Sequence, residues 1–319
     1  MLLASAAISW PLAARAQQSM PMLGVLSTRG QGEAPRLLAA FRQGLKDEGF
    51  VDGQNVAIEY RFADNRNDRL PALAADLAHR PVAAIAALST VAALAAKEAT
   101  ATIPIVFEMG GDPVRLGLVA NLSRPGGNVT GVTQLNVFVA LKRLELVHEL
   151  VPAAKLIGLL VDPTDAVNAY TTIGDLRTAA RSFGVELWIL NASTDNEIDA
   201  AFASAVEVKV GAIVIGGGAL YVGRQERLAA LALRHAMPAI YEGREFVAAG
   251  GLASYGGDFA DSYRLAGVYT GRVLKGEKPG DLPVQQGTKV EFYINLKSAK
   301  TLGLNVPPTL IGRAVEVIE

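Results

Sequence analysis

Polar and acidic residues follow several short apolar runs of this sequence, at the positions where we expect strands to end. They are Ser27 and Thr28, Ser89 and Thr90, Gly110 to Asp112, Asp162, Gly216 to Gly218, and Tyr241 with Glu242. Ligands of open parallel sheets bind beyond the carboxyl ends of the strands. Ser89 and Asp112 also precede expected helices, whose first amides are free to bind an anion. These positions could therefore hold a ligand carboxylate without an arginine.

The acidic members of this set could receive a positively charged group. Asp112, Asp162 and Glu242 are candidates for binding an ammonium group, because a cleft closed over a zwitterion must offer acceptors as well as donors. Tyr241 and Tyr255 stand at or near strand ends and could stack on a flat side chain. Each residue has an ordinary alternative role, as a helix cap, a solvated loop charge or an aromatic packed between lobes.

No sequence pattern for catalysis, metal binding or phosphate binding accompanies these residues. Gly216 to Gly218 is not followed by Gly-Lys-Ser/Thr, and no GxGxxG follows the first expected strand. The histidines His79, His148 and His235 fall far apart, in or at the end of expected helices, without an HExxH spacing. The chain has no cysteine and no GxSxG elbow. We therefore expect a protein that is not an enzyme and that needs no cofactor.

The elements that position the polar residues are expected to be successive βα units. Met22 to Ser27 is an apolar run suited to a strand buried on both faces, and Pro35 to Gly49 follows with helical spacing. The further strands are expected at residues 56–62, 82–88, 103–109, 128–133, 155–161, 185–191, 211–215 and 238–241. Gly110 to Val114 is expected to open a short helix. The series restarts after residue 133, so two parallel sheets of similar size are expected.

The regular alternation of expected strands and helices ends after residue 250, where the sequence predicts a short strand, a long helix at residues 259–275 and a last strand. This tail is too small for a third domain, so it should cross both lobes and form a hinge. We expect residues 17–135 with about 251–284 to form lobe 1. Residues 136–250 with about 285–319 are expected to form lobe 2.

The N-terminal run Leu2 to Ala16, LLASAAISWPLAARA, predicts a signal peptide comprising residues 1–16. It ends in Ala14-Arg15-Ala16, the small-x-small pattern of a cleavage site. A transmembrane helix needs about 20 apolar residues, so the run is too short for an anchor. No basic residue precedes it, and we expect the true start codon upstream. The pattern favours export to the periplasm.

Composition narrows the classes of partner and fold. The chain has 319 residues with 30 basic and 31 acidic side chains, a formal net charge of −1. This balance offers no positive field for nucleic acid, so no nucleic-acid partner is expected. Removing 16 residues from 319 leaves 303, and single hydrophobic cores stop growing at about 250–300 residues. Two lobes of an α/β protein are expected.

Several runs carry a resemblance to a known family. GGDPV and RPGGNVTGV are the most specific, together with AAFRQGLKDEGFVDGQNVAIEYRFAD, KRLELVHELVP, PAIYEGREFVAAGGLASYG and INLKSAKTLGL. They closely resemble substrate-binding proteins of ABC transporters, in the tryptophan- and tyrosine-binding-like family, over essentially the whole chain after the leader. The resemblance implies a type I periplasmic-binding-protein fold. In that fold two Rossmann-like lobes with parallel sheets are joined by a three-segment hinge and close over a ligand.

The resemblance also implies a set of ligand-binding residues in each lobe. They are Ser27, Ser89, Thr90, Gly110 and Asp112 in lobe 1, and Asp162, Asn168, Gly217, Tyr241 and Glu242 in lobe 2. The sequence departs from the family at Asp162-Pro163-Thr164-Asp165, where a loop of the type Asn-Pro-x-x-Pro is expected. The additional carboxylate could favour a ligand with more positive charge.

These observations lead to one main expectation and one alternative. We expect a monomeric periplasmic solute-binding protein that captures a small organic ligand, an amino acid or analogue, and delivers it to ABC permease subunits at the membrane surface. The alternative is an extracellular ligand-sensing protein of the same fold that reports to a receptor. A neighbouring pair of permease and ATPase genes would favour transport, and a neighbouring histidine kinase gene would favour sensing.

Overall fold

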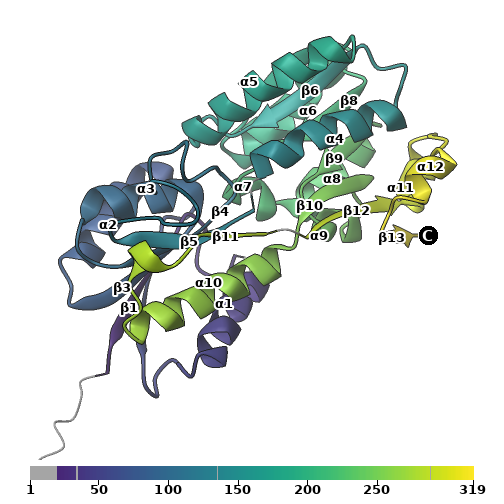
Figure 1. Ribbon diagram of the computed structural model, residues 1–319. Helices are drawn as coiled ribbons and strands as arrows, with labels where there is room; N and C mark the ends of the chain where they lie inside the picture. The colour runs from purple at the N-terminus through teal and green to yellow at the C-terminus, as the bar shows by residue number, and fades with distance from the viewer. Residues whose placement is uncertain (1–19, 34, 135, 288) are drawn as a thin grey trace, which may run out of the picture.

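The computed structural model describes residues 20–33, 35–134, 136–287 and 289–319. The expected signal peptide at residues 1–16 lies outside these ranges. Figure 1 shows two lobes, the first largely purple and blue and the second largely teal and green, each built on a sheet with helices on both faces. The expected α/β architecture of two lobes with parallel sheets is confirmed.

The first sheet has six strands in the order β11-β5-β4-β3-β1-β2, and every pairing in it is parallel. Its strands are β1 (Met22–Ser27), β2 (Ala57–Phe62), β3 (Val82–Leu88), β4 (Ile105–Met109), β5 (Val129–Thr133) and β11 (Gln285–Gln286). Its helices are α1 (Pro35–Asp47), η1 (Asn67–Arg69), α2 (Leu70–Ala78), α3 (Thr90–Ala99), α10 (Phe259–Leu274) and η2 (Pro279–Asp281). Helices α1 and α10 cover one face and α2 and α3 the other. Because both faces are buried, the inner strands are continuous apolar runs.

The second sheet has seven strands in the order β13-β12-β10-β9-β8-β6-β7. They are β6 (Leu156–Val161), β7 (Glu186–Asn191), β8 (Ala212–Ile215), β9 (Ala239–Tyr241), β10 (Ala253–Gly257), β12 (Val290–Asn295) and β13 (Glu316–Ile318). Helices α4 (Asn136–Leu150) and α5 (Ala166–Ser182) cover one face, and α6 (Asp195–Glu207) and α8 (Gln225–Arg234) the other. Short helices complete the lobe: α7 (Ala219–Val222), α9 (Arg244–Ala248), α11 (Leu296–Thr301) and α12 (Pro308–Ile311).

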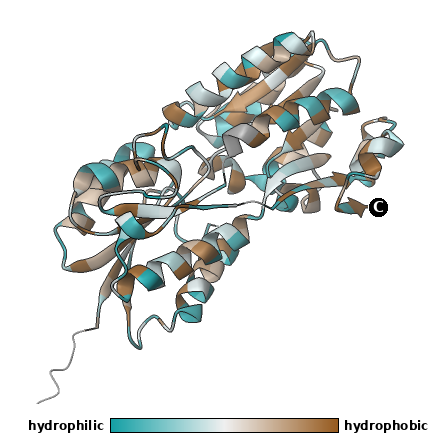
Figure 2. Ribbon diagram, in the orientation of Figure 1, coloured by the Kyte–Doolittle hydropathy of each residue, from teal (hydrophilic) through white to brown (hydrophobic). Residues whose placement is uncertain are grey.

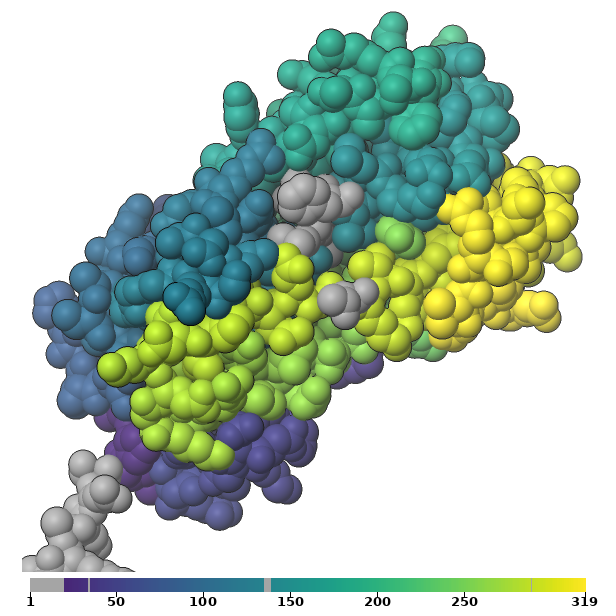
Figure 3. Space-filling view, in the orientation of Figure 1, coloured from purple at the N-terminus to yellow at the C-terminus, as the bar shows by residue number. Residues whose placement is uncertain are grey.

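The described chain crosses between the two sheets three times: from β5 to α4, from β10 to α10, and from β11 to β12. The lime and yellow residues of the tail run across the front of both lobes in Figure 3. Strand pairing places the last two crossings after Gly257 and after Gln286, later than the expected positions near residues 251 and 285. The sequence did not reveal the full length of β10, because glycine ordinarily indicates a loop. In the structure, a Cβ at Gly256 would lie 1.8 Å from the Glu242 carbonyl oxygen. Only glycine allows that strand to continue.

Helices α1 and α10 come from opposite ends of the chain and lie side by side below the first sheet (Figure 1). Their backbones approach closely at Gly44 and Gly267. A Cβ at Gly44 would lie 1.9 Å from the Arg264 carbonyl oxygen, and one at Gly267 would lie 2.1 Å from that of Phe41. The two glycines therefore fix α10, which follows the second crossing, against the first lobe.

The segment from Gly110 to Val114 differs from its expected structure. It forms turns instead of a short helix, with the Leu116 amide donating to the Asp112 carbonyl oxygen at 3.0 Å. Hydrophobic residues concentrate on the strands and on the inward helix faces (Figure 2). None of the described helices is both long and apolar enough to cross a membrane.

Candidate ligand-binding site

A cleft opens between the lobes, at the carboxyl ends of the strands of both sheets. It contains about 820 Å³ of space between atoms, part of it open to solvent. Loops after β1, β3 and β4 line it from the first lobe, and loops after β6, β8 and β9 line it from the second. The rule that ligands bind at this edge of a parallel sheet therefore applies to both lobes at once.

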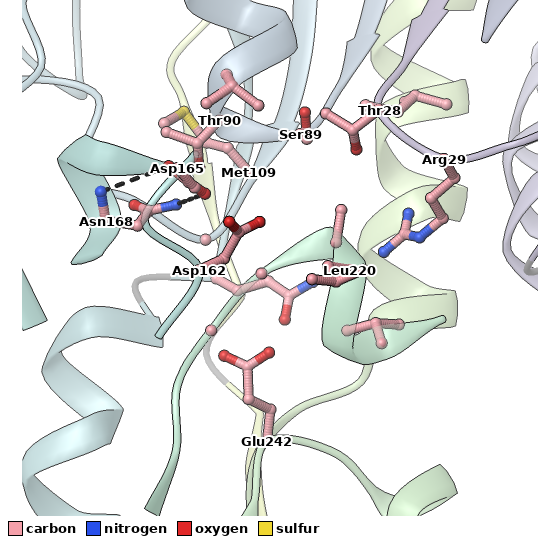
Figure 4. A pocket seen from close by; sticks show the side chains of 18 of the residues that line it. Thr28, Arg29, Ser89, Thr90, Met109, Asp162, Asp165, Asn168, Leu220 and Glu242 are labelled. Carbon is pink, nitrogen blue, oxygen red and sulfur yellow. Dashed lines mark hydrogen bonds between the residues drawn. The ribbon is translucent and has the colours of Figure 1, made fainter. Parts of the chain in front are cut away.

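The first-lobe wall offers hydrogen-bond donors around the start of α3. Ser89 caps this helix, and its Oγ accepts from the Ala92 amide at 3.1 Å. Thr90 follows it and is buried. The Thr28 hydroxyl is also buried, and no described residue forms a hydrogen bond with it. In Figure 4, Ser89 lies between Thr90, on the side of Asp165, and Thr28, on the side of Arg29. Hydroxyls beside free helix amides are suited to an anionic group.

Arg29 extends from the same lobe with its guanidinium group at the cavity (Figure 4). The side chain is buried, and its Nη1 donates to the hydroxyl of Tyr263 on α10. The guanidinium carbon also lies 5.6 Å from the centre of the Tyr263 ring. Tyrosine therefore holds this cation in place without neutralising it.

The second-lobe wall offers acceptors from the loop between β6 and α5. Asp162 Oδ1 accepts from the Thr164 amide at 2.9 Å and from its hydroxyl at 2.7 Å. Asp165 caps α5, and its Oδ2 accepts from Asn168 Nδ2 at 2.6 Å (Figure 4). Burial raises the pKa of Asp162, and it raises the pKa of Asp165 to about 6 against these hydrogen bonds. Both carboxyl groups are thus desolvated at the cleft.

A buried ion pair forms the floor of the cleft in the second lobe. Arg143 Nη2 lies 3.5 Å from Glu242 Oε1, and each side chain is at most 2 % exposed. Arg143 Nη1 also donates to the Ile215 carbonyl oxygen at 3.1 Å. Burial raises the pKa of Glu242 to about 7, although the guanidinium charge opposes this rise. The Glu242 carboxyl group is therefore poised to change charge near neutral pH.

Glu108 adds a carboxyl group from the first lobe. It lies near the end of β4 and accepts from Gln134 Nε2 at 2.8 Å and from the Ser262 hydroxyl at 2.9 Å. Burial raises its pKa, and Arg29 acts in the opposite direction. This carboxyl group thus joins β4 to α10 at the wall of the cleft.

Seven of the ten residues proposed from the sequence line the cleft. They are Ser89, Thr90, Gly110, Asp162, Asn168, Gly217 and Glu242. Their lining positions come from the structure, and their contact with a ligand stays a prediction. At Gly217 a Cβ would lie 2.5 Å from Glu242 Oε1, so this glycine leaves room for the carboxylate.

The structure places the other three residues outside the lining of this cleft. Ser27 is buried, and its hydroxyl accepts from the Arg29 amide at 3.2 Å. Asp112 caps a turn through the Val114 amide at 2.9 Å. Tyr241 is fully buried against Phe246, as inward-facing strand residues are. Packing and capping thus explain these side chains, which the structure does not bring into the lining of the cleft, and their contact with a ligand stays an untested prediction.

Sequence reasoning missed three charged residues of the cleft: Arg29, Glu108 and Arg143. Glu108 had a usable signal, because it is a carboxylate inside the otherwise apolar run IVFEM, and a buried charge needs a reason. No sequence signal identified Arg143, since an arginine on a helix is ordinarily solvated. Arg29 directly follows the strand-end residue Thr28 and could have been included by position.

Contacts between the lobes surround the cleft. Asn67 Nδ2 donates to the Thr164 hydroxyl at 2.9 Å. In the described part of the chain, three ion pairs also join the lobes: Glu33 with Arg224 at 3.0 Å, Arg36 with Glu245 at 2.9 Å, and Arg115 with Asp175 at 3.5 Å. Exposed pairs of this kind contribute about 0–1 kcal/mol each. These ion pairs can hold the lobes together once the contacts of a ligand with both lobes are added to them.

The Asp165→Asn variant is expected to be more stable than the parent at pH 8. The folded-state pKa of about 6 exceeds the ordinary pKa of an aspartate, about 3.9, so stability falls as pH rises through this interval and stays lowered above it. A shift of this size corresponds to roughly 2–3 kcal/mol. Asparagine still caps α5. Thermal unfolding from pH 4 to pH 8 checks this: an equal melting temperature of variant and parent at pH 8 would contradict it.

The chain matches known proteins over most of its length. A family model described as ABC transporter substrate binding protein matches residues 35–318. A tyrosine-binding protein of Clostridioides difficile is 32 % identical over 265 residues, covering 83 % of this chain and 75 % of that protein.

Two solved structures can be compared in conformation. The ABC domain from Streptococcus pneumonia in complex with L-Trp is 27 % identical, with a TM-score of 0.82 over 94 % of this chain and 100 % of that one. The ligand-free, open structure of a substrate-binding protein with adhesive properties from Clostridium difficile is 26 % identical, with a TM-score of 0.62 over 93 % of this chain and 99 % of that one. Over nearly the whole chain, the present structure is therefore more similar to the L-Trp complex than to the ligand-free, open structure.

Proposed function

Because the chain belongs to the ABC transporter substrate-binding proteins, a family that binds ligands without converting them, we propose that it is the periplasmic component of an importer. In this role it captures an amino acid or analogue between its two lobes and delivers it to the permease subunits. The type I periplasmic-binding-protein fold with its three crossings supplies the hinge for such a cycle.

The observation that carries this proposal is the opposition of donors and acceptors across the cleft. Ser89, Thr90 and the start of α3 face the cavity from the first lobe, and Asp162 and Glu242 face it from the second (Figure 4). A zwitterion placed between them would bond its carboxylate to one lobe and its ammonium group to the other. We propose that this bridging, with Gly110, Asn168 and Gly217 completing the wall, closes the lobes.

Lobe closure supplies the signal that the permease would receive. A ligand shifts the equilibrium between open and closed forms only by its differential affinity for them, and a ligand that contacts both lobes binds the closed form better. The contacts from Asn67 to Thr164 and from Glu33 to Arg224 form across the cleft in the arrangement described here. The closed form, with both lobes presented together, is the form proposed to dock.

Export and assembly state complete the proposal. A leader at residues 1–16 would send the protein to the periplasm, where it would act as a monomer. We assign the first lobe to residues 20–134 with 258–287, and the second to residues 136–257 with 289–319, on the strand pairing.

A thermal-shift screen against the twenty amino acids tests this function. A ligand at 100 times its dissociation constant stabilises the folded state by about 2.7 kcal/mol, which corresponds to a rise in melting temperature of roughly 4 °C for a chain of this length. At least one amino acid is expected to give such a rise, and its alcohol analogue without the carboxylate should not. If no amino acid raises the melting temperature, the proposed ligand class is wrong.

A further inference from the structure

The described wall of the cleft carries more acidic than basic side chains. The acids are Glu108, Asp162, Asp165 and Glu242, and the bases are Arg29 and Arg143. All six are buried. Building on the proposed function, we propose that the ligand is a basic amino acid or close analogue, whose side chain carries an ammonium or guanidinium group in addition to the α-ammonium group.

The two arginines account for two of the four acids. Arg143 lies 3.5 Å from Glu242 as an ion pair. Among the described residues Arg29 forms no ion pair with an acid, but its charge stabilises the ionised form of both Glu108 and Glu242. These cations are fixed by the Ile215 carbonyl oxygen and by Tyr263. The negative charge that is left over therefore lies elsewhere in the cleft.

The negative charge that the two arginines do not balance lies at Asp162 and Asp165. Their described partners are neutral: Thr164 for the first and Asn168 for the second. Neither carboxylate forms an ion pair with a described residue, and the charge of Asp162 adds to the rise in the pKa of Asp165. Two adjacent acids without a cation form a site for positive charge on the second lobe.

The opposite end of the cavity has an unused hydrogen-bonding group. Thr28 is 3 % exposed, and its Oγ1 has no hydrogen-bond partner among the residues that the structure describes. It lies on the first-lobe wall with Ser89, away from the acidic pair (Figure 4). A buried hydroxyl without a hydrogen-bond partner is destabilising, and a ligand carboxylate could accept a hydrogen bond from it. The cavity is thus polarised, with room for a ligand longer than its amino-acid head group.

The apolar part of the wall fits a methylene chain better than an aromatic ring. Among the described lining residues, Phe259 is the one aromatic. The other large apolar contacts are aliphatic: Leu88, Val91, Met109, Leu220 and Val222. Aliphatic walls that lead to an acidic end are the surroundings in which a lysine or arginine side chain buries its stem and keeps its charge paired.

A neutral zwitterion would leave the cleft with the same charge surplus that it has when empty. Closure removes the acids further from water, and an uncompensated buried charge costs several kcal/mol. A ligand with one additional positive charge offsets part of this cost, and it does so only in the closed form. The same acids thus select the ligand and favour closure.

Binding of L-lysine, L-arginine, L-norleucine and L-tyrosine, measured by isothermal titration calorimetry at pH 7.5, tests this inference. Norleucine has the methylene chain of lysine without the terminal ammonium group, so the pair isolates the charge. Lysine or arginine is expected to bind at least tenfold more tightly than norleucine and tyrosine. Equal or tighter binding of norleucine or tyrosine would overturn the inference while leaving the proposed function intact. Failure of all amino acids in the screen would overturn the proposed function itself.

The Asp162→Asn variant tests whether Asp162 is responsible for the preference for a positively charged ligand side chain. Asparagine keeps an oxygen for the Thr164 amide, so the turn is preserved. The variant is expected to bind lysine at least tenfold more weakly and norleucine within twofold of the parent. Asp112→Asn, which removes a carboxylate from a turn outside the cleft lining, is the matched control and should change neither. Equal lysine affinity in Asp162→Asn and parent would rule out the assigned role of Asp162.

Discussion

Replacing Arg143 with methionine is expected to lower the free energy of unfolding of the ligand-free protein by about 3–5 kcal/mol. The guanidinium group lies 3.5 Å from Glu242 in a pair that is almost fully buried, and it donates to the Ile215 carbonyl oxygen. Its removal leaves a buried carboxylate without its cation. Urea unfolding followed by circular dichroism measures the loss.

The dependence of this loss on pH identifies its cause. The folded-state pKa of Glu242 is already raised to about 7, and removing the cation raises it further, so the variant carries a protonated Glu242 at low pH. The loss should therefore be smaller at pH 5 and larger at pH 9. The double variant Arg143→Met with Glu242→Gln should recover at least half of the loss, because no buried charge remains. Equal losses in the single and double variants would contradict the ion-pair explanation.

Gly267→Ala is expected to destabilise the protein by about 3 kcal/mol, a large effect for one methyl group. The added Cβ would lie 2.1 Å from the Phe41 carbonyl oxygen and 2.9 Å from the Leu45 amide nitrogen. Both neighbours are backbone atoms of α1, so no side-chain rotation can make room. Helices α1 and α10 would have to separate, which opens the core below the first sheet.

Gly174→Ala is the matched control because it makes the same change in another helix. Gly174 lies in α5, and a Cβ there would meet no atom within 4 Å. Alanine is favoured over glycine in a helix by about 0.5–1 kcal/mol, so this variant should be slightly more stable than the parent. Thermal unfolding of both variants gives opposite signs if backbone contact sets the cost. If both variants lost stability to the same extent, helix propensity or the unfolded state, and not backbone contact, would set the cost of the substitution.

The inner strands could be predicted from the sequence because their surroundings are simple. β1, β3, β4 and β6 are buried on both faces, so a continuous apolar run is sufficient to identify them. β11 has only two residues and depends on its pairing with β5. The extension of β10 to Gly257 was also hidden, because glycine ordinarily indicates a loop. Elements that exist through tertiary contact leave little pattern in the local sequence.

The candidate site was predictable where position along a strand decides it. Ser89 and Asp162 follow strands β3 and β6, so topology brings them to the cleft. Tyr241 ends a strand as well, but its ring points into the core. Side-chain direction at a strand end depends on neighbouring packing, which the sequence does not specify. Arg143 reaches the floor of the cleft from a helix, and only the three-dimensional arrangement reveals its pairing with Glu242.

Small-angle X-ray scattering tests directly whether the two lobes close over an amino acid that the protein captures. The protein is measured without ligand and with a saturating amount of the amino acid that gives the largest rise in melting temperature. Without ligand, the radius of gyration is expected to exceed the value calculated from the structure described here. With ligand, it should fall to that value. An amino acid that binds and leaves the radius of gyration unchanged would contradict capture between the lobes.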